Sequence, residues 1–144
     1  MLSLWRRQVR EGVIVARAAK LDVELKARIR ELTRGTRGHR LLDVVAELRE
    51  PLLGWKAYFG IAEVLSPLRD IDKWIRRKLR CYHWKQWGRA GYRELRRRGV
   101  SVREAWHTSK SAHGPWRLSK TPALALALPA RYFRNLGLPS LAAR

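Results

Sequence analysis

Basic and aromatic side chains suited to binding a polyanion are concentrated between Leu65 and Trp87 of this 144-residue chain. On a helical wheel, with about 100° per residue, cations and two tryptophans share one side of this stretch. Lysine and arginine neutralise phosphates, and aromatic rings stack on unpaired bases. The basic side consists of Arg69, Lys73, Arg76, Arg77, Arg80, Trp84 and Trp87. We therefore predict a buried helix whose outer side is left free for a polyanion.

These side chains are positioned by the predicted helix that carries them, over residues 65–87. Ser66 is a favourable N-cap and Pro67 fits the first helical position, so the helix begins there. Gly88 and Gly91 predict its end. An apolar stripe on the side away from the cations would form its core contacts. That stripe consists of Leu68, Ile71, Ile75, Leu79 and Tyr82.

Two further amphipathic stretches precede it, which together predict an all-α, three-helix bundle. The first runs over residues 21–34, and its stripe consists of Leu21, Leu25, Ile29 and Leu32. The second runs over residues 40–59, and its seam consists of Leu41, Val45, Leu48, Leu52, Trp55 and Phe59. Pro51 interrupts this second pattern and should kink the helix or restart it.

Shorter helices are expected after Trp87. Ser101 and Glu104 form a capping box that opens a helix through about Ser109, and the residues from Thr121 onward predict two more short helices. The arginines at 96–98 either complement a helix dipole or contact phosphate, and the charge around them favours phosphate. A Gly/Pro/Ser-rich loop adds further candidates for RNA contact. The candidates in this region are Arg96, Arg97, Arg98, Lys110, Trp116 and Arg117.

The overall charge points to the same class of partner. The chain has a net charge of +20, from 32 Lys+Arg against 12 Asp+Glu. Residues 69–98 hold 12 basic and 3 acidic residues, the highest density in the chain. Nucleic acid is the favoured partner, because its phosphates release counterions on binding. An anionic membrane surface is a weaker alternative, and no stretch approaches the roughly 18 apolar residues of a spanning helix.

The residue types that usually catalyse reactions or bind metals do not form a site. Asp70 and Asp72 lie two positions apart on a helix, do not face each other, and are expected to pair with neighbouring lysine and arginine residues. Cys81 stands alone, which excludes an internal disulfide, and is expected to be a core residue rather than a reactive thiol. The four histidines, which lack a second ligand at helical spacing, are His39, His83, His107 and His113. No nucleotide-binding, zinc-protease or nucleophile-elbow motif is present. We therefore expect neither a catalytic site, nor a metal, nor a cofactor.

The segment from Met1 to Lys20 has no sustained apolar region and no cleavage site of a secretory signal. It is rich in arginine, but Glu11 and its short length argue against an organelle transit peptide. We therefore expect a bacterial cytoplasmic protein. Val13 to Ala16 is β-prone, and this segment is either a frayed leader or the stub of another domain.

Several sequence blocks together resemble the maturase-specific region of group II intron-encoded proteins. The blocks are RIRELTRGTRG, LLGWKAYFGIAE and DKWIRRKLRCYHWKQW, followed by YRELRRRGVS, AWHTSKSAHGPWRLSKTPAL and YFRNLGLPSL. In that family a reverse transcriptase is followed by a helical thumb and by a region called domain X. The resemblance covers roughly residues 20–141. No YADD-type polymerase motif and no HNH endonuclease accompany it.

The resemblance implies a domain organisation and a function. Residues 1–20 would be a leader or a palm-domain stub, residues 21–88 a three-helix thumb-like bundle, and residues 89–144 the remainder of domain X. The chain would be a non-catalytic module that binds group II intron RNA and assists its folding and splicing. The RNA-facing role carries over first to Arg76, Arg77, Arg80, Lys85 and Trp87, and then to Arg96, Arg97, Arg98, Trp116 and Arg117.

Two alternatives stay open. The chain could be the thumb fragment of a split or truncated reverse transcriptase that assembles with a separate palm domain, or a degenerate remnant without a working partner. Binding of duplex DNA through a helix-turn-helix is less favoured, because no capped pair of helices of that kind stands out.

Overall fold

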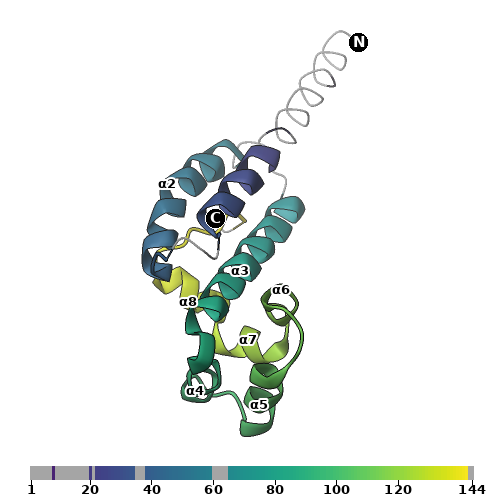
Figure 1. Ribbon diagram of the computed structural model, residues 1–144. Coiled ribbons are helices and arrows are strands. Elements are labelled where there is room, and N and C mark those ends of the chain that lie inside the picture. The colour runs from purple at the N-terminus through teal and green to yellow at the C-terminus, as the bar shows by residue number, and fades with distance from the viewer. Residues whose placement is uncertain (1–7, 9–19, 21, 35–37, 60–64, 143–144) are drawn as a thin grey trace.

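The computed structural model describes Gln8, Lys20 and residues 22–34, 38–59 and 65–142, without the side chains of residues 58–59 and 65–67. All regular structure in these ranges is helical, which confirms the all-α prediction (Figure 1). The β-prone residues 13–16, the stripe position Leu21 and the side chain of Phe59 lie outside the described part of the chain. So does the choice between a leader and a palm stub.

Three helices form the upper part of the molecule in Figure 1: a helix over residues 22–32, α2 (Leu41–Phe59) and α3 (Leu65–Trp87). The predicted stripes face one another and are buried. α2 runs through Pro51 without interruption, so the predicted restart of the helix is wrong. Leu48 and Leu52 on either side of the proline are fully buried, and this packing outweighs the roughly 3 kcal/mol that a proline costs within a helix.

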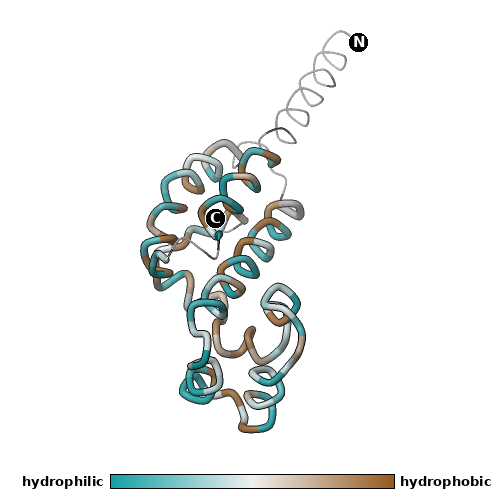
Figure 2. The backbone as a smooth tube through the Cα atoms, in the orientation of Figure 1, coloured by the Kyte–Doolittle hydropathy of each residue, from teal (hydrophilic) through white to brown (hydrophobic). Residues whose placement is uncertain are grey.

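The lower part of the molecule is built from short helices around the second half of α3. They are η1 (Gly88–Ala90), α4 (Gly91–Arg97), α5 (Val102–Lys110), α6 (Pro115–Leu118), α7 (Pro122–Ala127) and α8 (Ala130–Asn135). α6 and α4 contact α3 directly, and α7 contacts α4 and α5. Ser101 caps α5 as predicted, because its Oγ accepts the Glu104 N–H. Figure 2 shows that the segment containing α7 is mainly hydrophobic. Ala123, Leu124 and Ala127 of this helix are buried, while Leu126 on its other side is exposed.

Two glycines turn the chain where α4 and α8 end. Gly99 and Gly137 have φ angles of 96° and 103°, a region that side chains rarely allow. At each turn the next residue donates its N–H back into the helix, from Val100 to the Leu95 carbonyl and from Leu138 to the Phe133 carbonyl. These are Schellman motifs. The second of them directs residues 138–142 back toward the three-helix part (Figure 1).

Asp72 binds this returning C-terminal segment, which corrects the prediction that it pairs with neighbouring cations. Its carboxylate accepts the Ser140 hydroxyl at 2.7 Å and the N–H groups of Leu141 and Ala142 at 2.9 and 3.0 Å. Asp72 and Leu141 are both buried. A buried carboxylate needs such donors, and these come from residues 68 to 70 positions away, beyond the reach of a helical wheel. We call this contact the Asp72 clasp.

Candidate nucleic-acid interface

The part of the chain from α3 onward is strongly basic. Residues 65–142 contain 18 lysines and arginines but only 4 acidic residues. Two of those acids already have partners, because Asp72 holds the C-terminal segment and Glu94 pairs with Arg97 at 3.0 Å. Most of the positive charge is therefore not balanced by the protein, and dense uncompensated charge of this kind attracts polyanions.

The first half of α3 presents cations that are free to bind a ligand. Arg69 and Lys73 are exposed and form no hydrogen bond or ion pair with another described residue. Arg76 follows one turn later on the same side and is half-buried at the edge of a hollow. Lys85 is also exposed, near the end of the helix. We call Arg69, Lys73 and Arg76 the free strip.

Arg77 does not belong to a free surface. Its Nε donates to Ser119 Oγ at 3.0 Å and its Nη2 to the Trp116 carbonyl at 2.9 Å. Its guanidinium also lies 3.7 Å from the centroid of the Trp116 ring. Ser119 is the C-cap of α6, so Arg77 donates to groups at the unsatisfied end of that helix.

Arg80 makes the equivalent contact one turn further along. Its Nε donates to the carbonyl of Leu128, the C-cap of α7, at 2.8 Å. Burial, and to a smaller extent the charge of Arg76, lowers the pKa of Arg80 from its usual value. The prediction that this side of α3 stays free is therefore wrong in its second half. The physical reason is that α6 and α7 end there and leave carbonyls that need donors.

The two predicted tryptophans of α3 are packing residues in this structure. The Trp84 and Trp87 rings meet edge to face at 6.0 Å, and both are half-buried. A Cβ at Gly91 would lie 2.8 Å from the Trp84 ring, so glycine allows the ring to lie against the start of α4. Arg98 lies 5.1 Å from the centroid of the Trp87 ring. Both rings thus have packing partners within the fold, and the exposed part of Trp87 lines a hollow with Arg89 and Arg93.

The remaining predicted contacts are on α4, α5 and α6 and are mostly exposed. Arg96 donates to the Val100 carbonyl at 2.8 Å, and Arg97 pairs with Glu94. Lys110 lies 4.9 Å from the centroid of the exposed Trp106 ring. Arg117 is exposed and lies 3.2 Å from the His113 ring nitrogen. These cations are available to a ligand, but they do not form one site with the free strip.

A cation–aromatic ladder on the other side of α3 was not predicted from the sequence. Lys78 Nζ lies 5.5 Å from the centroid of the Trp74 ring and 4.7 Å from that of Trp116. Arg30, from the first helix, approaches the same Trp74 ring at 5.5 Å. Burial lowers the pKa of Lys78, and the neighbouring cations Arg30, Lys85 and Arg77 lower it further against an opposing effect of Cys81. The spacing of Trp74 and Lys78, four residues apart, was the available signal.

Cys81 is buried near Lys78, whereas His83 is half-buried beside Trp87 and Tyr132. Cys81 is 7% exposed, which confirms it as a core residue, and burial raises its pKa. His83 Nδ1 lies 3.2 Å from Gln86 Oε1, while its buried Nε2 has no partner among the described residues. Burial lowers the pKa of His83, a hydrogen bond to Gln86 opposes the shift, and Arg98 adds to it. Both groups are suited to packing.

Two other kinds of site are absent from the described residues. No group of three or more histidine, cysteine or acidic residues there is placed to hold a metal ion. None of the described helices is long and apolar enough to cross a membrane.

Comparison with known proteins identifies the family. No curated protein matches the chain. The profile described as "Group II intron, maturase-specific domain" matches residues 23–100, which is more than half of the sequence. That stretch contains the three helices, the free strip and α4. The matched domain is a non-catalytic region of such proteins. The chain therefore belongs to the group II intron maturase-specific domain family and has a maturase-related role.

Proposed function

We propose that this chain is a non-catalytic RNA-binding module that binds group II intron RNA and assists its folding and splicing. The observation that carries the proposal is the unbalanced positive charge from α3 onward, together with the free strip on the first half of α3. Membership of the maturase-specific domain family supports group II intron RNA as the partner in this proposal.

The physical mechanism is the neutralisation of phosphates. A compact RNA brings backbone phosphates close together, and their repulsion opposes folding. Cations at fixed positions on a rigid helix release counterions when they bind those phosphates. Because a partner that binds only the folded form stabilises it by mass action, the module would favour the splicing-competent RNA without taking part in the chemistry.

The test is a salt-titrated binding assay with three ligands: a group II intron RNA, an unrelated structured RNA of equal length, and duplex DNA. We expect a preference for the intron RNA that persists at raised salt. Binding of all three ligands with equal affinity, fading uniformly with salt, would contradict the proposal, since it would show only the net charge of the chain.

A pair of variants locates the interface. Replacing Arg69, Lys73 and Lys85 by Ala should reduce the salt slope by about 2, because each phosphate that is no longer neutralised lowers the slope by about 0.7. The matched control replaces three cations that are paired with acidic residues on the first two helices. These are Lys26, Arg28 and Arg40. Both variants remove the same charge. An equal effect on binding would therefore reject the exposed cations of α3 as the interface.

A second candidate is the thumb fragment of a split reverse transcriptase that assembles with a separate palm domain. The observation that favours it is a pair of exposed leucines on one side of α2, with the exposed Arg49 between them. Leu42 and Leu53 are about half exposed and lie eleven residues, or about three helical turns, apart on the same side. Mixing the chain with separately expressed fingers and palm would restore reverse transcription if this candidate is right. Replacing both leucines by Ser should then abolish the recovery.

A further inference from the structure

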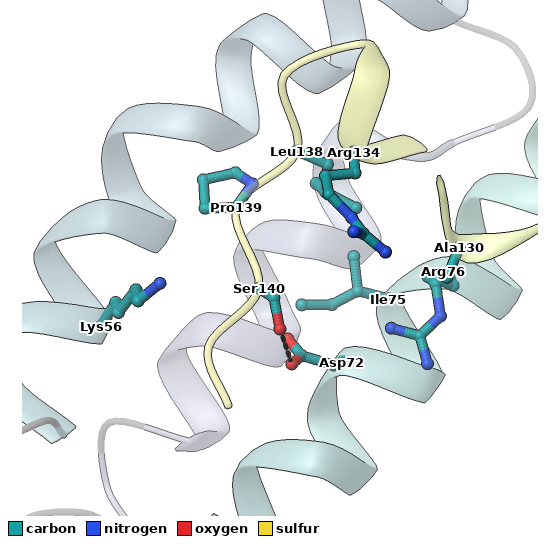
Figure 3. Close-up of a pocket in the computed structure, with 9 residues that line it drawn as sticks. All are labelled: Lys56, Asp72, Ile75, Arg76, Ala130, Arg134, Leu138, Pro139 and Ser140. Carbon is teal, nitrogen blue, oxygen red and sulfur yellow. Dashed lines mark hydrogen bonds between the residues drawn. The ribbon is translucent and has the colours of Figure 1, made fainter. Parts of the chain in front are cut away.

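A hollow of about 430 Å³ opens at the end of the free strip. It lies between α2, α3, α8 and the returning C-terminal segment. Figure 3 shows Lys56 on one side, Arg76 with Ala130 on the other, and the Asp72–Ser140 hydrogen bond between them. The residues that line it are Lys56, Asp72, Ile75, Arg76, Ala130, Arg134, Leu138, Pro139 and Ser140.

The hollow is cationic in spite of the carboxylate in its wall. Lys56, Arg76 and Arg134 contribute three positive charges, and none of them forms an ion pair with another described residue. The Asp72 carboxylate is occupied by the three donors of the clasp. Two arginines from different helices at one opening suit a phosphate, because each guanidinium can donate two parallel hydrogen bonds to it.

The remaining walls are apolar, which a site for a bare phosphate would not need. Ile75 and Ala130 line the α3 and α8 sides, and Leu138 and Pro139 line the side of the returning segment. The volume falls within the roughly 300–1,000 Å³ of small-molecule pockets. Apolar surface of this extent can cover the flat face of a base.

We propose that this hollow binds one unpaired nucleotide, with its phosphate held by Arg76 and Arg134 and its base against Leu138 and Pro139. The inference deepens the proposed function and rests on it, because the free strip leads an RNA strand to the opening. Proteins that recognise RNA sequence mostly bind unpaired bases, usually on aromatic rings or guanidinium planes, and here the apolar wall takes that place. The clasp has a direct part in the site, since it fixes the segment that forms one wall.

The experiment is an NMR titration of the full chain, because this method detects weak binding. The ligands are adenosine 5′-monophosphate, inorganic phosphate and a single-stranded adenylate hexamer. The monophosphate should bind more tightly than phosphate. Arg134→Ala should weaken its binding about tenfold, the effect of removing one charge-assisted hydrogen-bonding partner. The matched control is Arg131→Ala, an exposed arginine on the same helix that does not line the hollow, and it should change affinity less than about twofold.

A second variant tests the hollow without changing charge. Ala130→Trp places an indole in the space, and it should abolish binding of the monophosphate while Arg69 and Lys73 of the free strip, which do not line the hollow, are unchanged. Equal binding of phosphate and monophosphate, an equal loss in Arg131→Ala, or full binding in both Arg134→Ala and Ala130→Trp would each overturn the proposal.

The hexamer identifies the source of the nucleotide. If the bound nucleotide belongs to an RNA strand, the hexamer binds more tightly than the monophosphate, and Arg69→Ala weakens the binding of the hexamer alone. If Arg69→Ala leaves both unchanged, the site takes free nucleotides and the link to the strip is overturned. If the chain binds intron RNA normally but does not bind the monophosphate, the hollow is not a nucleotide site, and the proposed function still stands. A bound monophosphate without intron preference would reject the function instead.

Discussion

The two halves of α3 carry the same kind of basic stripe but place it in different surroundings. In the first half, Arg69 and Lys73 extend from the three-helix part into solvent. In the second half, Arg77 and Arg80 donate to the ends of α6 and α7. The cations of the first half are thus exposed to solvent, while those of the second half donate to the C-terminal ends of short helices. A basic stripe therefore indicates a ligand surface only where no helix C-terminus lies within reach.

The largest effect should come from removing the arginines of the covered half. Arg77→Ala combined with Arg80→Ala should lower the free energy of unfolding by roughly 3–5 kcal/mol, since each removes a hydrogen bond from a charged donor. Arg69→Ala combined with Lys73→Ala, with the same change of charge, should alter it by less than about 0.5 kcal/mol. Urea denaturation followed by circular dichroism measures both. Equal stability of the two variants would remove the distinction between the halves.

This result also decides how the RNA-binding role should be tested. Replacing Arg76, Arg77 and Arg80 together mixes one residue of the free strip with two that hold the fold. Any loss of binding in that variant would have two explanations. Separate substitution of Arg76 keeps the helix ends intact.

A smaller effect is expected for Trp84 of the covered half. Trp84→Ala leaves a gap beside Gly91 and Trp87 and should cost about 2 kcal/mol, less than the roughly 3–5 kcal/mol of a fully buried tryptophan, because the ring is half-buried. The salt slope of RNA binding should not change, since the indole ring neutralises no phosphate. Thermal unfolding and the binding assay give the two readings. A normal Tm with weakened RNA binding would show instead that the ring touches RNA.

The smallest effect concerns pH. Burial holds the pKa of His83 below its usual value, so the unfolded chain binds a proton more readily than the folded chain. Stability is then complete above about pH 6.5 and falls as the pH drops toward the folded pKa, by about 1.4 kcal/mol per pKa unit of difference. His83→Gln should remove this loss of stability between neutral and acidic pH.

Hydrogen exchange locates the change. Between pH 7 and pH 5, after correction for the intrinsic rates, exchange should accelerate in α3 residues 79–87 and not in residues 68–75, which contain no histidine. Acceleration along the whole helix, or an unchanged pH dependence in His83→Gln, would contradict this assignment.

Much of the fold could be predicted from the sequence, because it depends on local periodicity. Ile71, Ile75 and Leu79 of the predicted stripe are buried, and α3 ends at Trp87 as its glycines indicated. The Ser101 cap is likewise a local signal. The same local rules identified Arg69 and Lys73 as exposed cations.

The covering of α3 could not be predicted in the same way. α6, α7 and α8 have four to six residues each, too few for a period to show which side packs. The partners of Asp72 and of Arg80 lie 48 to 70 positions away. The hollow was also out of reach, since Lys56, Arg76 and Arg134 lie on three different helices and the turn at Gly137 brings in residues 138–140 as a further wall.

The Asp72 clasp has a consequence for the order in which the protein forms during translation. Asp72 leaves the ribosome with its helix, but its donors are about 70 residues further along the chain. At roughly 5–20 residues per second, they are added some 4–14 seconds later. Until then the carboxylate is solvated and the hollow lacks the wall formed by the returning segment, and for most of that time the wall formed by α8 as well. A nascent chain can therefore display the free strip before it can enclose a nucleotide, and RNA that meets it early would contact only the strip.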